Sequence, residues 1–109
     1  MTISELENLV KTTSFVGFET QLGYVVFPII KPNCEWLVTV VGEILVVRYV
    51  RYNKKQNKIL YSTNYKISID KVDPKAFELE LDELQRNWNR VNKLKYSTDL
   101  LNEIQKDFK

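Results

Sequence analysis

The first apolar residues of the chain recur at the spacing of a helix, in which residues three and four apart share a face. Four residues make this face: Ile3, Leu6, Leu9 and Val10. Thr2 and Glu5 stand at the positions of a capping box, where a hydroxyl and a carboxylate satisfy the free amides of a helix start. The pattern predicts a short helix over residues 3–12.

The pattern then changes to runs of β-branched and aromatic residues broken by turn residues, which is typical of short strands. The predicted strands span residues 15–20, 24–30, 36–41, 43–52, 58–62 and 65–69. Gly42 and Glu43 suit a type II′ hairpin turn with glycine first. Pro28 predicts an edge or a bulge, because proline cannot donate to a ladder. Thr63 and Asn64 alone part the last two runs, so we expect an antiparallel meander of five or six strands.

A long apolar stripe near the C-terminus is the strongest periodic signal in the chain. Its members, at spacings of 4, 3, 4 and 3, are Phe77, Leu81, Leu84, Trp88 and Val91. Asp73 followed by Pro74 predicts a helix start, with an N-cap and a proline at the first helical position. Residues 77–81 also alternate with period two, as in a strand, but the longer stripe favours a helix.

A second apolar group follows the stripe. Its members share a helical face and are Leu100, Leu101, Ile104 and Phe108. Ser97 and Thr98 are helix-capping residue types, so we expect a break near Tyr96, followed by a kinked continuation or a separate short helix. The predicted fold is α+β and a single domain over residues 1–109. A short N-terminal helix precedes a bent antiparallel sheet, and a long C-terminal helix or helix pair packs on one face.

The composition removes several kinds of chemistry. The 109 residues include no histidine, one cysteine and three glycines. This composition argues against a histidine-based triad, a His or Cys zinc site, a disulfide framework and a glycine-rich phosphate loop. The acidic residues at 78–83 lack the spacing of a calcium loop, and no nucleophile motif is present. We therefore expect no enzyme, no cofactor, no metal and no small-molecule substrate.

The N-terminal sequence and the length of the apolar runs indicate where in the cell the protein is expected. The first ten residues hold two glutamates and no basic stretch ahead of an apolar one, so no signal peptide is predicted. The longest apolar run, at 36–47, is well short of the roughly 18 residues that cross a bilayer. A lone Cys34 fits a reducing compartment, so we expect a cytoplasmic protein. Abundant Lys, Asn, Ile and Tyr with few Gly and Pro is typical of AT-rich genomes and favours a low-GC bacterium or its phage.

Positive charge gathers in the middle of the chain, although the net charge is only +2. The candidate nucleic-acid residues on the predicted hairpin are Arg48, Arg51, Tyr52, Lys54, Lys55 and Lys58. Cations hold phosphates and aromatic rings stack on bases, but strand alternation allows one surface to use only half of this set. The simpler interpretation is a solvated hairpin whose tyrosines pack on the core and whose lysines discourage edge pairing.

The first functional hypothesis is a non-enzymatic protein-interaction or regulatory module. The two apolar groups of the C-terminal region offer more surface than one small sheet needs. They predict contact with another protein, or self-association, through the residues at 100, 101, 104 and 108. Trp88 is expected in the core, and Trp36 is expected to be half exposed and closer to a partner. Nucleic-acid binding by the basic hairpin, with cations of the late helix, is the alternative.

Overall fold

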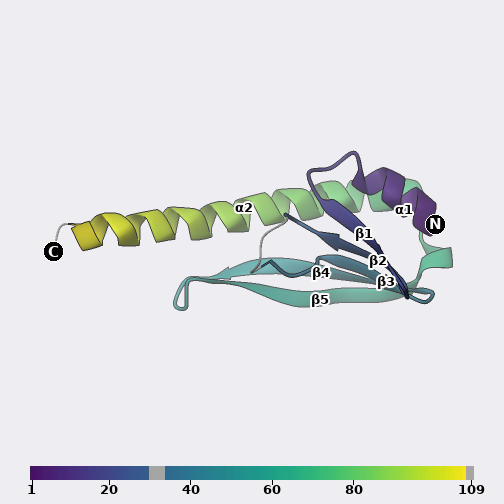
Figure 1. The fold of residues 1–109 in the computed structure, drawn as a ribbon, viewed down its shortest axis with the longest axis horizontal. Helices are drawn as coiled ribbons and strands as arrows, with labels where there is room; N and C mark the ends of the chain where they lie inside the picture. Colours follow the sequence, from purple (N-terminus) through teal and green to yellow (C-terminus); the bar gives the residue numbers. More distant parts are fainter. Residues whose placement is uncertain (30–33, 108–109) are drawn as a thin grey trace.

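The computed structural model describes residues 1–29 and 34–107. It has a short helix, a five-stranded antiparallel sheet in meander order and one long C-terminal helix, so the α+β prediction is confirmed (Figure 1). In chain order the elements are α1 (Ile3–Val10), β1 (Val16–Thr20), β2 (Gly23–Phe27), β3 (Val38–Val41), β4 (Ile44–Asn53), β5 (Lys58–Ser68), the 3-10 turn η1 (Ile69–Lys71) and α2 (Pro74–Asp107).

Helix α1 begins where the sequence predicts. The Glu5 amide donates to Thr2 Oγ1 at 3.1 Å, and the Thr2 amide donates to the Glu5 carboxylate at 3.0 Å, which completes the capping box. The helix ends at Val10 and not at Thr12. The Thr12 hydroxyl donates to the Leu9 carbonyl at 2.7 Å and satisfies one of the free carbonyls at the helix end.

The β3–β4 hairpin has the predicted turn. Gly42 has a φ of 61°, while Glu43 is not among the described residues with positive φ, which is the pattern of a type II′ turn. Strand β2 ends at Phe27, so Pro28 follows the strand instead of lying inside it at an edge or bulge. The remainder of that predicted strand, residue 30, lies outside the described residues.

Strand β5 corrects the expectation of two separate runs at 58–62 and 65–69. It is one strand of 11 residues, so the sheet has five strands and not six. Val47 pairs with Tyr65 and Arg48 pairs with Thr63, which leaves Asn64 as the extra residue of a β-bulge. The polar residues that resemble a turn in the sequence therefore accommodate a bulge in the sheet.

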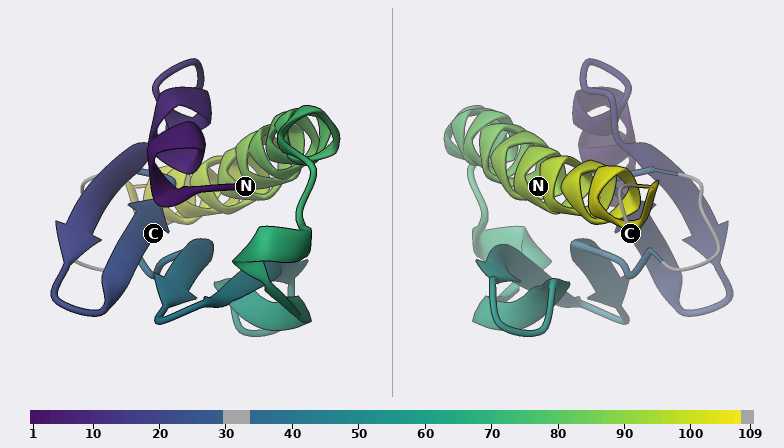
Figure 2. Two further views of the ribbon diagram at one scale, coloured as in Figure 1. Left: turned by 90° about the vertical axis from the view of Figure 1, so that its right-hand side faces the viewer. Right: turned by 90° about the vertical axis from the view of Figure 1, so that its left-hand side faces the viewer.

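Helix α2 lies across one face of the bent sheet, with α1 on the same face (Figure 2). Every member of the apolar stripe is buried: Phe77, Leu81, Leu84, Trp88 and Val91. The Ala76 amide donates to Asp73 Oδ2 at 3.3 Å, which confirms the predicted N-cap. Residues 77–81 are helical, as the longer stripe favoured.

The expected break near Tyr96 is wrong, because α2 continues from Pro74 to Asp107. The Thr98 hydroxyl donates to the Leu94 carbonyl, four residues earlier, at 3.0 Å. A threonine can therefore satisfy its hydroxyl inside a continuing helix, without capping a new one. The 34 residues of α2 make a rod about 51 Å long. Its last turns project past the tip of the β4–β5 hairpin (Figure 1).

Candidate functional site

The tip of the β4–β5 hairpin is hydrogen-bonded to the second half of α2. The Tyr52 hydroxyl lies 2.8 Å from Thr98 Oγ1 and 2.8 Å from Asn57 Oδ1. Asn57 Nδ2 donates to Asp99 Oδ1 at 2.6 Å, and Lys95 Nζ lies 3.0 Å from Asp99 Oδ2. This network, which we call the tip network, fixes the hairpin end against the helix.

The turn at the tip explains how the sequence presents these groups. Asn57 has a φ of 51°, in the left-handed region that asparagine tolerates better than most residues. Asn53 Oδ1 accepts a hydrogen bond from the Gln56 amide at 3.2 Å, as asparagine does in tight turns. The polar residues 53–57, between the predicted strands 43–52 and 58–62, therefore form an ordered turn, and the last of them bonds to α2.

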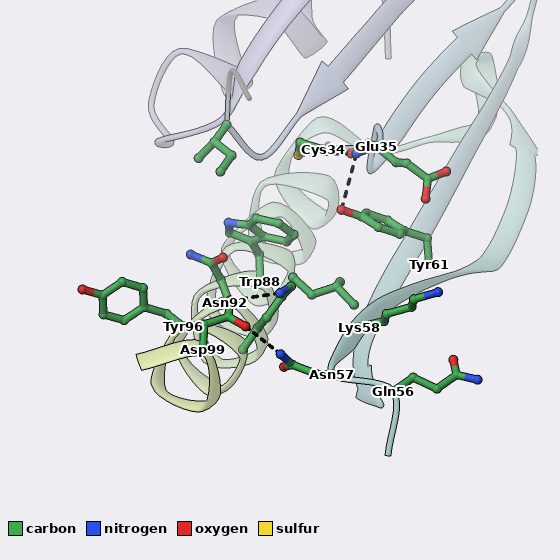
Figure 3. Close-up of a pocket in the computed structure, with 13 residues that line it drawn as sticks. Cys34, Glu35, Gln56, Asn57, Lys58, Tyr61, Trp88, Asn92, Tyr96 and Asp99 are labelled. Atoms are coloured by element: carbon green, nitrogen blue, oxygen red, sulfur yellow. Dashed lines mark hydrogen bonds and ion pairs between the residues drawn. The ribbon is translucent and has the colours of Figure 1, made fainter. Parts of the chain in front are cut away.

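A groove of about 670 Å³ separates α2 from the hairpin (Figure 3). Trp88, Asn92 and Tyr96 line it from α2. Ile59 and Tyr61 line it from β5. Cys34 and Glu35, which precede β3, lie near one end of it (Figure 3). The groove thus combines aromatic and amide side chains from segments that are distant in the sequence.

The two carboxylates that line the groove, those of Glu35 and Asp99, each pair with a cation. Glu35 Oε1 lies 3.5 Å from an Arg48 nitrogen, and Asp99 is bonded to Lys95. The hydrogen bonds from Lys95 and Asn57 hold the pKa of the Asp99 carboxyl below its ordinary value. Burial raises the pKa of Tyr61 to about 12, so the Tyr61 phenol is neutral at physiological pH. The groove therefore presents neutral aromatic surface beside neutralised carboxylates.

The described residues contain no group of three His, Cys, Asp or Glu side chains placed to hold a metal ion. At the start of α2, Glu78, Asp82 and Glu83 are exposed to solvent. Glu80 instead accepts a hydrogen bond from the Tyr65 hydroxyl. Burial, and then this bond, raise the pKa of Tyr65 above its ordinary value of 10.0. The contact ties β5 to the first turns of α2.

Arg48 and Tyr52, two of the predicted nucleic-acid residues, are engaged inside the protein. The Arg48 guanidinium lies 3.6 Å from the centre of the Trp36 ring and also pairs with Glu35. This cation–π contact covers part of the Trp36 ring, which is half-buried. Tyr52 contributes its hydroxyl to the tip network.

Three other predicted residues come together on the opposite side of the tip. Arg51, Lys54 and Lys55 line a hollow of about 310 Å³, together with Tyr52, Asn53 and Leu60. Lys58 pairs with Asn53 across the strands and is also exposed. We call the exposed cations Arg51, Lys54, Lys55 and Lys58 the basic tip.

The predicted protein-interaction residues lie near the free end of α2. Leu100, Leu101 and Ile104 are 45%, 58% and 45% exposed. Leu94, about two turns before Leu101, is also exposed. Phe108, the fourth predicted residue, lies outside the described residues.

Comparison with known proteins identified no relative of this chain. No protein-family model, curated protein or solved structure matches this chain. In the described part of the chain, no helix has both the length and the apolar character needed to span a bilayer. The assignment of function therefore rests on the surfaces described above.

Proposed function

We propose that this protein is a non-enzymatic interaction module that associates with a second copy of itself through the outward side of α2. The observation that carries the proposal is that the apolar residues of α2 occupy two different sides of the helix. One side is buried on the sheet, and the other is exposed to solvent near the free end.

The side of α2 that faces the sheet changes character along its length. It is apolar as far as Val91 and then polar, with Lys95, Thr98 and Asp99. Thr98 and Asp99 bond to the hairpin tip. Beyond Val91, the contact between α2 and the sheet is therefore made by polar side chains, and apolar residues are not needed on that side of the helix.

The later apolar residues turn away from the sheet. At 3.6 residues per turn, Leu94, Leu101 and Ile104 centre about 130° around the helix axis from the buried stripe. We call these three residues and Leu100 the outward patch. No described residue covers it, and the four side chains are each exposed by nearly half or more. Exposed large apolar side chains that gather on one side of a helix are typical of contact sites.

Charge around the outward patch favours an antiparallel second copy. Arg90 precedes Leu94 by four residues and continues the same helical face. A parallel pair would place Arg90 against the partner's Arg90. An antiparallel pair places Arg90 near the C-terminal turns of the other α2, where the helix dipole is negative.

The size of the patch sets the strength of the contact. Stable interfaces bury about 800 Å² on each partner, and four partly exposed side chains on one helix supply less. We therefore expect weak association that rises with concentration. The sheet and the hairpin lie on one side of α2 (Figure 2), and the outward patch turns away from that side.

Sedimentation equilibrium at several protein concentrations tests the proposal. The wild-type protein should shift from the mass of one chain toward the mass of two. The double variant Leu101→Glu, Ile104→Glu should stay at one chain, because it places charges in the contact. Leu79→Glu is the matched control, since Leu79 is an exposed leucine near the opposite end of α2. A wild-type protein that stays monomeric throughout, or an equal loss in the Leu79 variant, would contradict the proposal.

A further inference from the structure

We infer that the basic tip of the β4–β5 hairpin binds the phosphate backbone of nucleic acid. The site is separate from the outward patch, and the inference does not depend on self-association. It follows from the charge, the exposure and the anchoring of four cations.

The basic tip is a local excess of positive charge without internal neutralisation. Residues 51–58 contain four cations and no acid. In the part of the chain that the structure describes, the ion pairs are Lys11–Glu7, Arg48–Glu35 and Lys95–Asp99, and none includes a residue of the basic tip. All four cations are exposed. They are therefore available to a negatively charged ligand.

The tip network gives this charge a fixed platform. Tyr52 and Asn57 hold the turn to Thr98 and Asp99 on its inner side. Arg51 and Asn53 alternate with Tyr52 along β4, so their side chains point away from α2. Both residues line the hollow, together with Lys54 and Lys55 of the turn. A ligand does not have to order the loop when it binds, so less entropy is lost than with a free arm.

The distribution of the cations favours a polymer of phosphates. Arg51 lies in β4, Lys54 and Lys55 lie in the turn, and Lys58 begins β5. Charges spread over a turn and two strands match a chain with one negative charge at each repeat. A single phosphate group would need convergent donors around one point.

The surroundings of the basic tip disfavour a lipid surface. Proteins that lie on membranes combine cations with exposed large apolar side chains. No exposed large apolar residue lies among residues 51–60, which the structure describes in full. Leu60, in the hollow, is half-buried.

The same surroundings predict which part of the nucleic acid is recognised. Tyr52, the aromatic residue of the predicted set, has its hydroxyl in the tip network and lies partly buried. Contacts should therefore go to phosphates and should not depend on base sequence. Binding of this kind is strongly weakened by salt, because each phosphate contact releases counterions.

Fluorescence anisotropy with a labelled, mixed-sequence DNA duplex at several salt concentrations tests the inference. The wild-type protein should bind at low salt, with log affinity falling linearly with log salt. The triple variant Arg51→Gln, Lys54→Gln, Lys55→Gln should lower that slope by about 2–3 units, close to one for each phosphate that the variant no longer binds. The matched control Lys66→Gln, Lys71→Gln, Lys75→Gln removes the same charge from exposed lysines away from the tip and should leave the slope nearly unchanged.

Three outcomes would overturn the inference. One is the absence of any complex at low salt. Another is an equal loss in both triple variants, which would show that only net charge matters. The last is equally tight binding to vesicles of phosphatidylserine and phosphatidylcholine that is also lost in the tip variant, because a membrane would then be the partner. Circular dichroism of each variant confirms that the fold is retained.

Discussion

At the scale of single residues, the two tryptophans show the difference between a core position and a position near the surface. Trp88 is 4% exposed within the buried stripe of α2, whereas Trp36 is half-buried beneath the Arg48 guanidinium. Helical spacing predicts the buried position of Trp88, and the half-exposed position of Trp36 is expected from its place at the start of a predicted strand. A contact with a partner at Trp36 stays a prediction.

Substitution of each tryptophan should show this difference in burial as a difference in stability. We expect Trp88→Ala to lower the free energy of unfolding by about 3–5 kcal/mol, the usual loss on emptying a large aromatic site in a core. Trp36→Ala is the control and should cost less, because part of that ring already meets solvent. Chemical denaturation measures both. A Trp88 loss below about 1 kcal/mol, the scale of a surface change, would contradict the packing described here.

The half-buried residues Tyr61 and Tyr65 make stability depend on pH in the alkaline range. Burial raises the pKa of Tyr61 to about 12, and it also raises the pKa of Tyr65 from the ordinary 10.0. In the unfolded chain these phenols ionise near pH 10, so the unfolded state releases its protons first as the pH rises. The stabilisation is complete below pH 10 and is lost progressively from pH 10 to about 12.

Urea denaturation across this pH range tests the tyrosine effect. The free energy of unfolding of the wild-type protein should fall above pH 10. The fall should be shallower in the variant Tyr61→Phe, Tyr65→Phe, which has two fewer phenols to ionise. Parallel pH profiles for the two proteins would show that these phenols do not control the alkaline loss.

The role of a residue cannot be predicted from local sequence patterns when it depends on a partner that is distant in the sequence. The spacing of Ile3 and Leu6, or of Asp73 and Pro74, is local and predicts the helix starts well. The contact between Tyr52 and Thr98 joins residues 46 positions apart. Local patterns carry no information on such a pair, so Tyr52 resembles a stacking residue in the sequence and is a structural anchor in the fold.

At the scale of secondary-structure elements, the β3–β4 turn is the best specified feature. Gly42 has a φ of 61°, which a residue with a side chain adopts only with strain. Nothing lies within 4 Å of a Cβ added there, so the backbone angle alone sets the penalty. We expect Gly42→Ala to lower the free energy of unfolding by about 1–2 kcal/mol.

The neighbouring residue provides the control for this turn. Glu43→Ala should change stability by no more than about 0.5 kcal/mol, because the Glu43 side chain is exposed and Glu43 has no positive φ. Thermal or chemical denaturation measures the two variants. Equal effects at Gly42 and Glu43 would contradict the assigned turn.

Two element-level predictions fail for a shared reason. Thr63 with Asn64, and Ser97 with Thr98, are residue types that favour turns and caps, but they also fit a bulge or a helix interior. Pairing with β4 keeps β5 continuous at the first site. The second site stays helical, with the Thr98 hydroxyl bonded to the Leu94 carbonyl. Tertiary and backbone contacts decide such cases, and the identity of the residues does not.

At the scale of the whole molecule, the candidate surfaces gather around one end. The hairpin tip and the last turns of α2 lie at that end, while α1 lies at the other (Figure 1). The groove lies between α2 and the hairpin. The sequence predicts the cations and the outward apolar residues separately. It does not predict the groove, because strand pairing and the crossing of α2 bring its walls together.

The central claim is that the outward patch of α2 is a contact surface between two copies. Hydrogen exchange of backbone amides, followed at low and high protein concentration, tests it at the level of the residues concerned. We predict that exchange at residues 94–104 slows as concentration rises, while exchange at 77–91, already buried on the sheet, stays the same. Identical exchange of residues 94–104 at all concentrations would contradict it.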